Sequence, residues 1–301
     1  MVSIAGFERG SHWSLSSAQE LKVSDALEKD CSGPTGRTLI EEGFSKLGEY
    51  VDIANGLVSG LDKAFRIPDK LRAVLTTKEQ GAVLRAIKAL GMEPYVSHTV
   101  VEYIDIPAGL TEGEVKKDYP HFYEHLSERR EQLEARYSYQ KELPFWEWAF
   151  RRSEKFHLSP VKKGFIPCKE RITNKPIARF SLAPVGAAAT QDVTAFAPKA
   201  GVRESIEYIV AYLCHPSVTD WFCNRGLLKG GIAEFSERPL SSIPFRAIDW
   251  DNPDEVQIHD DVVALMEKLE CCQDSKRLRL IEQVDEKIGM LLPSVDQEYL
   301  A

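Results

Sequence analysis

Thirty residues in the middle of the chain, from Arg151 to Phe180, carry a strong excess of positive charge. Two acidic residues lie among them, and the nine basic ones are Arg151, Arg152, Lys155, Lys162, Lys163, Lys169, Arg171, Lys175 and Arg179. Guanidinium and ammonium groups at this density suit contacts with phosphate oxygens. The alternative for any such run is an ordinary solvated surface, and the run taken alone favours that alternative.

Residues that could hold a metal ion or activate water are sparse. The candidates nearest to a metal cluster are Cys214, His215 and Cys223. No second pair of ligands stands at zinc-finger spacing, so we interpret these three as core or helix-surface residues. His121 and His125 lie one helical turn apart, but no acidic third ligand is in register, and a solvated helix face is the stronger interpretation. A hydrolase that uses one of these or His157 would depend on isolated histidines only.

Composition sets the broad class of protein. The chain has 301 residues, of which 43% are hydrophobic, and this is enough for a folded core. No apolar run approaches the roughly 20 residues of a membrane-spanning helix. The six cysteines are scattered without a repeated spacing, which favours a reducing compartment. We therefore expect a folded, cytoplasmic protein with no membrane association.

The net charge of -8 has the wrong sign for a general nucleic-acid binder. The charge is, however, segregated along the chain. Residues 251–301 carry thirteen acidic and five basic side chains, whereas residues 151–180 have a local net charge of +7. One part of the protein could therefore face phosphates while another is held away from them or meets a basic partner.

The pattern of apolar residues predicts the elements that position these side chains. Before residue 140 it indicates a helix at 18–27, a strand at 47–53 that enters a glycine turn, a helix at 83–90 ended by Gly91, a strand at 96–106 and a long amphipathic helix at 119–139. After that it indicates strands at 165–167, 178–182 and 193–196, a helix at 205–213 that resumes through Trp221 and Phe222, and two amphipathic helices within 262–292.

These elements predict an α+β fold, in which mixed short strands accompany a long amphipathic helix and a C-terminal helical segment. We expect a lead-in segment at 1–46, a main domain at 47–250 and acidic C-terminal helices at 251–301.

A series of motifs runs in a fixed order from residue 47 to residue 245. It opens with a strand and a Gly-x-x-x-Gly-x-Asp-x-Ala-Phe turn that contains Gly56, Gly60, Asp62 and Phe65. It continues with the Tyr119-Pro120 helix, the segment Phe145-Trp146-Glu147-Trp148, the strands near 165–167 and 178–182, and an exit from Gly230-Gly231 to a strand at Leu240-Ser241-Ser242-Ile243-Pro244. The series resembles the TaqI-like C-terminal specificity domain, or target recognition domain, of adenine-N6 DNA methyltransferases and type II restriction-modification enzymes.

This resemblance implies a domain that binds double-stranded DNA. Such a domain must place side chains on base edges in the major groove and anchor itself on phosphates, and basic residues on loops suit both tasks. Besides the nine basic residues above, the candidates for DNA contact are Lys63, Arg225 and Lys229. The family's Leu-Asn-Ser is replaced here by Leu213-Cys214-His215-Pro216-Ser217, so no role of that asparagine can be transferred.

The motifs of methyl transfer itself are missing from the sequence. An adenine methyltransferase needs a glycine loop that holds S-adenosylmethionine and an Asn/Asp-Pro-Pro-Tyr/Phe segment that binds the flipped adenine. The chain has no Pro-Pro dipeptide and no Gly-x-Gly between a strand and a helix. We therefore expect no catalytic residues here, and S-adenosylmethionine on a catalytic partner.

The leading hypothesis is a DNA sequence-recognition subunit or separated domain that directs an adenine-N6 DNA methyltransferase or restriction-modification complex to its target. Its partners would be double-stranded DNA and a methyltransferase or restriction subunit. We expect the C-terminal helices, which are apolar on one face and acidic overall, to be the surface on which that subunit docks. Deleting residues 256–301 should then abolish co-purification and leave the remainder folded. The alternative, which fits the overall acidity, is an interaction or inhibitor protein built on the same fold that does not bind DNA.

Overall fold

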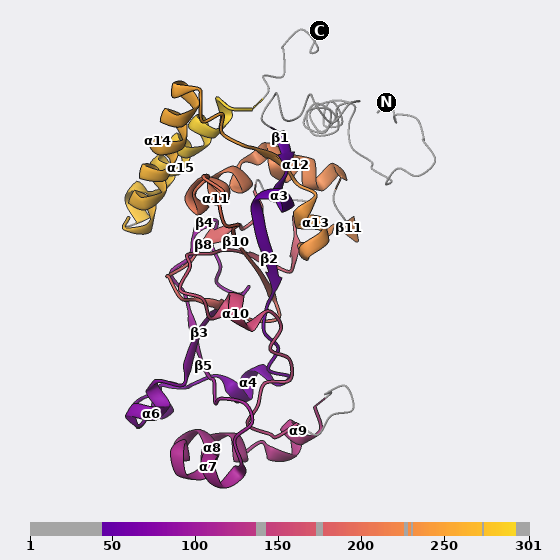
Figure 1. Ribbon diagram of the computed structural model, residues 1–301, viewed down its shortest axis with the longest axis vertical. Helices are drawn as coiled ribbons and strands as arrows, with labels where there is room; N and C mark the ends of the chain where they lie inside the picture. Colours follow the sequence, from indigo (N-terminus) through magenta and orange to yellow (C-terminus); the bar gives the residue numbers. More distant parts are fainter. Residues whose placement is uncertain are drawn as a thin grey trace.

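The computed structural model describes residues 44–136, 143–172, 177–225, 228–229, 231–272 and 274–292. Figure 1 shows an elongated molecule with a lobe at each end. Among the described residues, the large lobe comprises those at 44–56 and 193–292, with the strands at 95–96, 164–167, 169–171 and 181–182. The small lobe comprises those at 57–86 and 101–148, with the strand at 188–189. Each lobe has its own apolar core. A smaller cluster that includes Ile87 and Phe165 joins them.

A five-stranded sheet underlies the large lobe. Its strand order is β2 (Val51–Asn55), β10 (Val193–Pro198), β6 (Gly164–Pro167), β8 (Ser181–Leu182) and β4 (Tyr95–Val96). Neighbouring strands are antiparallel except β4 and β8, which are parallel. In β10, Phe196 enters the core of the large lobe while Val193 and Ala195 face the joining cluster. Because alternate side chains of a strand point to opposite faces, this central strand is buried on both sides.

Helices cover the sheet at the upper end of the molecule in Figure 1. They are α11 (Ile206–Cys214), α12 (Pro216–Arg225), α14 (Pro253–Glu270) and α15 (Asp274–Gly289). The short elements beside them are β1 (Phe44–Lys46), which pairs with β13 (Pro244–Arg246), α3 (Leu47–Tyr50) and α13 (Glu237–Ser241). α11 begins where the Ser205 side chain accepts a hydrogen bond from the Tyr208 amide, and nearly all of its side chains are buried.

The small lobe combines a three-stranded sheet with short helices. β3 (Val83–Ile87) lies between β5 (Val101–Ile104) and β9 (Ala188–Ala189). The helices are α4 (Asp62–Phe65), α5 (Asp69–Arg72), α6 (Thr77–Gln80), α7 (Glu112–Asp118), α8 (Pro120–Ser127) and α9 (Arg130–Glu134). Their core includes Phe65, Phe122 and Trp148, which are all fully or almost fully buried.

The remaining elements lie along the chain between the lobes and beside the large lobe. One is the single turn of α10 (Glu154–His157). The others form a second three-stranded sheet, in the order β11 (Leu228–Lys229), β12 (Ile232–Glu234) and β7 (Lys169–Arg171).

Several predicted elements are confirmed. The mixture of helices and short strands agrees with the α+β class. The strands at 165–167 and 193–196 correspond to β6 and β10, the helix at 205–213 to α11 with its continuation α12, and the two C-terminal helices to α14 and α15. The predicted helix at 18–27 lies outside the described residues.

Other predicted elements are wrong, each for a physical reason. In the predicted helix at 83–90, residues 83–87 are a strand, because β5 and β9 offer hydrogen-bonding edges on both sides of them, and residues 88–90 are not helical. The predicted helix at 119–139 is interrupted at Arg129, whose backbone has φ of -121°, and the described part is two short helices. The predicted strand at 47–53 begins with the helical turn α3. The predicted exit strand at 240–244 contains the end of α13, a turn, and only the first residue of the strand β13.

Candidate nucleic-acid interface

The glycine turn that opens the motif series joins the two lobes. The amide of Gly56 donates to the Val193 carbonyl at 3.1 Å. A Cβ at Gly56 would lie 2.0 Å from the Thr190 carbonyl oxygen, so only glycine allows this close approach. Gly60 has φ of +82°, a backbone conformation that favours glycine. These two glycines are therefore explained by packing and backbone geometry.

Asp62, in the same turn, belongs to an ion-pair bridge, which we call the Lys88 clasp. The Lys88 ammonium lies 3.0 Å from a carboxylate oxygen of Asp62 and 3.0 Å from one of Asp192. The side chains are 15%, 26% and 36% exposed for Lys88, Asp62 and Asp192, so the bridge is partly shielded from water. The Tyr103 hydroxyl also donates to Asp62, at 2.9 Å. Burial works against ionisation of Asp192, but hydrogen bonds from Thr190 and Lys88 lower its pKa below the ordinary value. The clasp fastens the small lobe to the turn between β9 and β10.

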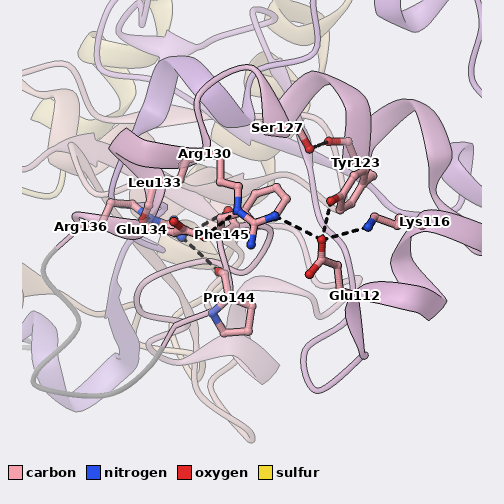
Figure 2. Close-up of polar contacts among 10 residues, drawn as sticks. All are labelled: Glu112, Lys116, Tyr123, Ser127, Arg130, Leu133, Glu134, Arg136, Pro144 and Phe145. Carbon is pink, nitrogen blue, oxygen red and sulfur yellow. Dashed lines mark hydrogen bonds and ion pairs between the residues drawn. The ribbon is translucent and has the colours of Figure 1, made fainter.

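Arg136 holds the small lobe together from within (Figure 2). Its guanidinium donates to the main-chain carbonyls of Leu133, Ser59, Glu147, Pro144 and Phe145. It also lies over the Phe65 ring, 5.4 Å from the centroid. Burial lowers its pKa to about 10. The glycine turn, the helix α9 and the aromatic segment at 145–148 thus meet on one side chain that the sequence analysis did not single out.

Glu79 is a second buried charge in the small lobe. Its carboxylate accepts from the Thr76 amide at 2.9 Å, which completes a capping box at the start of α6. It also accepts from the amides of His121 at 2.7 Å and Phe122 at 3.2 Å, at the start of α8. Burial opposes the charge, yet these hydrogen bonds lower the pKa of Glu79 below its ordinary value. One carboxylate therefore caps two helices.

Figure 2 also shows a more exposed network between α7, α8 and α9. The Glu112 carboxylate accepts from the Tyr123 hydroxyl, from Lys116 and from Arg130. Its pKa is lowered to about 2, chiefly by the hydrogen bond from Tyr123. This network orients α7, α8 and α9 relative to one another.

Four basic residues of the stretch are buried or half-buried and contact partners inside the protein. Arg151, whose side chain is 17% exposed, pairs with Asp105 and Glu154. Lys162 pairs with Glu207 and Glu270, which ties the start of β6 to α11 and α14. The other two engaged residues are Lys163, whose ammonium donates to main-chain carbonyls, and Arg179, which pairs with Glu170 and donates to two carbonyls. Much of the positive charge is thus neutralised by structural contacts.

The other described members of the stretch are exposed. Arg152 and Lys155 lie at the single turn of α10, where Ser153 has φ of +48°. Lys169 and Arg171 lie on β7, and the side chain between them is buried. Lys63, on α4 in the small lobe, is also exposed. These five cations come from three separate parts of the chain, so no single element presents the exposed positive charge.

The remaining predicted site residues are described only in part. Lys175 and Gly230 lie outside the described residues. The backbone places Arg225 at the last residue of α12 and Lys229 on β11. Gly231 has φ of +79°, as a glycine turn requires. Phe65 is fully buried, with its ring centroid 5.7 Å from that of Trp148, so its role is in the core.

The histidine and cysteine candidates have structural roles. The expectation that His121 and His125 lie on a solvated helix face is wrong. The His121 ring contacts the Glu79 carboxylate, and the His125 ring contacts the Ala64 carbonyl. The buried Cys214 thiol donates to the Phe180 carbonyl at 3.1 Å, and burial raises its pKa. Among the described residues, no three His, Cys, Asp or Glu side chains are grouped so that they could hold a metal ion.

The C-terminal helices turn their apolar sides inward. Val262, Met266 and Leu269 of α14 and Val284 and Ile288 of α15 belong to the same core as α11. The expectation that this apolar face docks a partner is therefore corrected, since the chain itself covers it. Removal of residues 256–301 would expose the core of the large lobe and would not leave the remainder intact. The exposed acidic sides of the two helices are still available. None of the helices in the described part of the chain could cross a membrane.

Comparison with known proteins finds relatives among type II methyltransferases. It is 40% identical over 247 residues to the type II methyltransferase M.HindII of Haemophilus influenzae, a match that covers 82% of this chain and 47% of the relative. The type II methyltransferase M.HincII of Haemophilus influenzae is 39% identical over 233 residues, or 77% of this chain and 46% of the relative. No protein-family model matches the chain.

A solved structure shares the fold. The Type IIL restriction-modification enzyme MmeI, in complex with DNA, superimposes with a TM-score of 0.57 and 11% identity over 83% of this chain and 34% of that one. The homologues of the chain are thus type II methyltransferases, and a restriction-modification enzyme has a similar fold. The chain spans about half the length of the curated relatives it matches.

Proposed function

We propose that the chain is the DNA target-recognition part of an adenine-N6 DNA methyltransferase or restriction-modification system, as a subunit or separated domain of the TaqI-like kind. The observation that carries this proposal is the 40% identity to about half of a type II methyltransferase. The motifs that hold the cofactor and the flipped base are missing from this half. The half of the methyltransferase that corresponds to this chain would then recognise the DNA target sequence.

Methyl transfer would take place on the catalytic part of the system. S-adenosylmethionine would supply the methyl group there. The residues of this chain do not fit that cofactor, because the sequence lacks a Gly-x-Gly loop between a strand and a helix. The expected contribution of the chain is to bind a DNA site and present the target adenine.

The DNA contacts would come from the exposed cations. Ion pairs and hydrogen bonds hold Arg151, Lys162, Lys163 and Arg179 in the protein, so these four are reassigned to stability. The candidates among side chains that the structure describes are Lys63, Arg152, Lys155, Lys169 and Arg171, all of which are exposed. With three to five phosphate contacts, affinity for duplex DNA should fall roughly 40- to 500-fold between 50 and 200 mM salt.

The direct test is selection of bound duplexes from a random pool by the purified chain at moderate salt. An enriched motif supports sequence recognition. A matched pair of double variants sharpens the result, with Arg152→Ala/Lys155→Ala at exposed cations and Lys116→Ala/Lys117→Ala on exposed positions of α7 as the control. The first pair should weaken binding and reduce the salt slope, while the second should do neither.

A protein-binding function without DNA is the second candidate. It is favoured by the net charge of -8 and by the neutralisation of much of the basic stretch. A protein interface of mixed polarity responds weakly to salt, whereas binding through several phosphates responds steeply. Absence of any salt-dependent DNA affinity, with or without the catalytic partner, would transfer support to this second function.

The docking of a catalytic partner can be tested without removing the C-terminal helices. Asp260, Glu267 and Glu282 are exposed acidic residues on α14 and α15. Reversal of these charges to lysine should weaken co-purification with the partner and leave the melting temperature almost unchanged, because surface substitutions usually cost less than about 0.5 kcal/mol. Unchanged co-purification would exclude this face as the docking site.

A further inference from the structure

The three-stranded sheet β11-β12-β7 is fixed to the protein by one face. On that inner face, Glu170 is buried and pairs with Arg179, whose guanidinium also donates to the carbonyls of Ala89 and Met92. Ala233 of the central strand is fully buried in the core of the large lobe. These contacts hold the sheet rigidly enough to present the opposite face as a defined surface.

The strand register determines which side chains share the outer face. Arg171 is directly opposite Ile232, and Lys169 is directly opposite Glu234. Neighbouring side chains on the same strands, Glu170 and Ala233, point inward, so the alternation of strand side chains puts these four outward. Lys169 and Arg171 are exposed, and Ile232 is 38% exposed although it lies on the central strand.

We propose that this outer face, formed by Lys169, Arg171, Ile232 and Glu234, reads base edges in the major groove of double-stranded DNA. The inference rests on the proposed function and names the surface that gives it sequence specificity. Arginine pairs with the O6 and N7 atoms of guanine, a carboxylate accepts from the N4 amino group of cytosine, and an apolar side chain contacts the methyl group of thymine. All three kinds of base contact are present on this one face.

The composition of the face separates base reading from simple phosphate binding. A surface that only neutralised phosphates would gain nothing from an exposed isoleucine, and a carboxylate such as Glu234 would be repelled by the backbone. The dimensions also agree. The four side chains lie on two neighbouring strands, β7 and β12, at about 4.8 Å spacing, and the major groove, roughly 12 Å wide, admits a two-stranded β-ribbon. By contrast, Arg152 and Lys155 have no such apolar or acidic neighbour on a strand and suit phosphate contacts.

The experiment measures base preference and overall affinity separately. The full chain first selects its motif from random duplexes, and competition assays then compare this duplex with every single-base-pair variant at fixed salt. Arg171→Ala should lose discrimination at one guanine position by roughly 5- to 150-fold, the range expected for a bidentate contact. Ile232→Ser and Glu234→Ala should relax preference at other positions. Affinity for a random duplex should change by less than about threefold for Glu234→Ala and Ile232→Ser, because neither residue adds a phosphate contact.

Two controls keep the outcome interpretable. Arg85→Ala removes an exposed arginine from β3, on a strand of the small lobe, and should leave the motif unchanged. A thermal melt confirms that each variant is folded. If the wild-type chain selects a motif and none of the three sheet variants alters it, this inference is overturned while the proposed function stands. If the wild-type chain binds no duplex at low salt, both are overturned.

Discussion

The two lobes are stabilised in different ways. In the large lobe, buried polar groups find partners nearby. The hydroxyls of Tyr208 and Tyr212 donate to the carbonyls of Arg246 and Pro244, each at 2.6 Å. The buried carboxylate of Glu204 accepts from the Ile248 amide at 3.1 Å. In the small lobe, the ionised side chains of Glu79 and Arg136 lie among short elements and contact several main-chain groups each. Both lobes thus bury charged side chains, but in the small lobe one charged side chain joins several short elements at once.

The lengths of the helices explain this difference. α14 has 18 residues and buries a row of apolar side chains, whereas α4, α5 and α6 have four residues each. Isolated helices shorter than about 12 residues are marginal in water, since the unpaired main-chain groups at their ends outweigh the few internal hydrogen bonds. A charged side chain that satisfies several of these groups at once compensates for the short length.

Substitution of Arg136 by alanine should be the most damaging change to the small lobe. Five carbonyls lose a donor, and the space that the guanidinium fills over the Phe65 ring is emptied. We expect a loss of about 4 kcal/mol in the free energy of unfolding, the magnitude seen when a buried charged partner is removed. Urea titration measures this change in the free energy of unfolding. Arg152→Ala, whose side chain is exposed, is the control and should change little. A loss below about 1 kcal/mol for Arg136→Ala would contradict the role of this side chain.

Met266→Ala tests the large lobe by the same measurement. Met266 is fully buried on α14 within the core around α11, so its truncation leaves an apolar cavity. A loss of about 3 kcal/mol is expected, and it should not depend on pH because no ionisable group is removed. Met290→Ala, at a methionine that is 61% exposed, is the matched control. A loss no larger than that of the control would show that Met266 does not support the core of the large lobe.

The contrast between the lobes also decides how much could be predicted from the sequence. In the large lobe, α11, α14 and α15 bury regular apolar faces, and their apolar periodicity predicted them. In the small lobe, residues 83–90 were predicted as a helix, but hydrogen bonds to β5 and β9 make residues 83–87 a strand. Such partners are distant in sequence, with β9 about a hundred residues away, and local periodicity carries no information about them.

The candidate site was predictable only as a set of residue types. Counting charges identified the basic stretch, but it could not show that Arg151, Lys162 and Arg179 meet carboxylates contributed by other elements. The buried roles of Glu79 and Arg136 were not predicted, because both resemble ordinary charged residues of amphipathic helices. One signal was available for Glu79, since Thr76 and Glu79 have the spacing of a capping box.

Glu79→Gln should give a smaller loss that depends on pH. The folded protein lowers the pKa of Glu79 below its ordinary value of 4.5, so the ionised carboxylate adds stability above that pH and loses it as the pH falls through the folded-state pKa. We expect wild type to exceed Glu79→Gln by about 2 kcal/mol at neutral pH, because hydrogen bonds to a charged group are stronger than neutral ones. Below pH 4.5 the difference should shrink.

A matched capping box provides the control for Glu79. Thr111 and Glu114 form the same motif at the start of α7, but there the motif is exposed to solvent. Glu114→Gln should therefore cost less than Glu79→Gln in the same pH series of urea titrations, since water can replace the lost hydrogen bonds. Equal losses at the two sites would mean that the capping geometry alone, and not burial of the carboxylate between two helices, explains the effect.

The smallest expected effect concerns the Lys88 clasp, where the lobes meet. Lys88→Met removes the ammonium between Asp62 and Asp192, and because these carboxylates are partly exposed the loss should be about 1 kcal/mol. A double-mutant cycle with Asp192→Asn isolates the pair from other consequences of each change. The coupling energy should fall as salt rises, because ion pairs that water can reach are screened. Coupling that is absent at low salt would mean that hydrogen bonds to Asp192 from Thr190 and the Ala89 amide, and not the clasp, hold this turn against the small lobe.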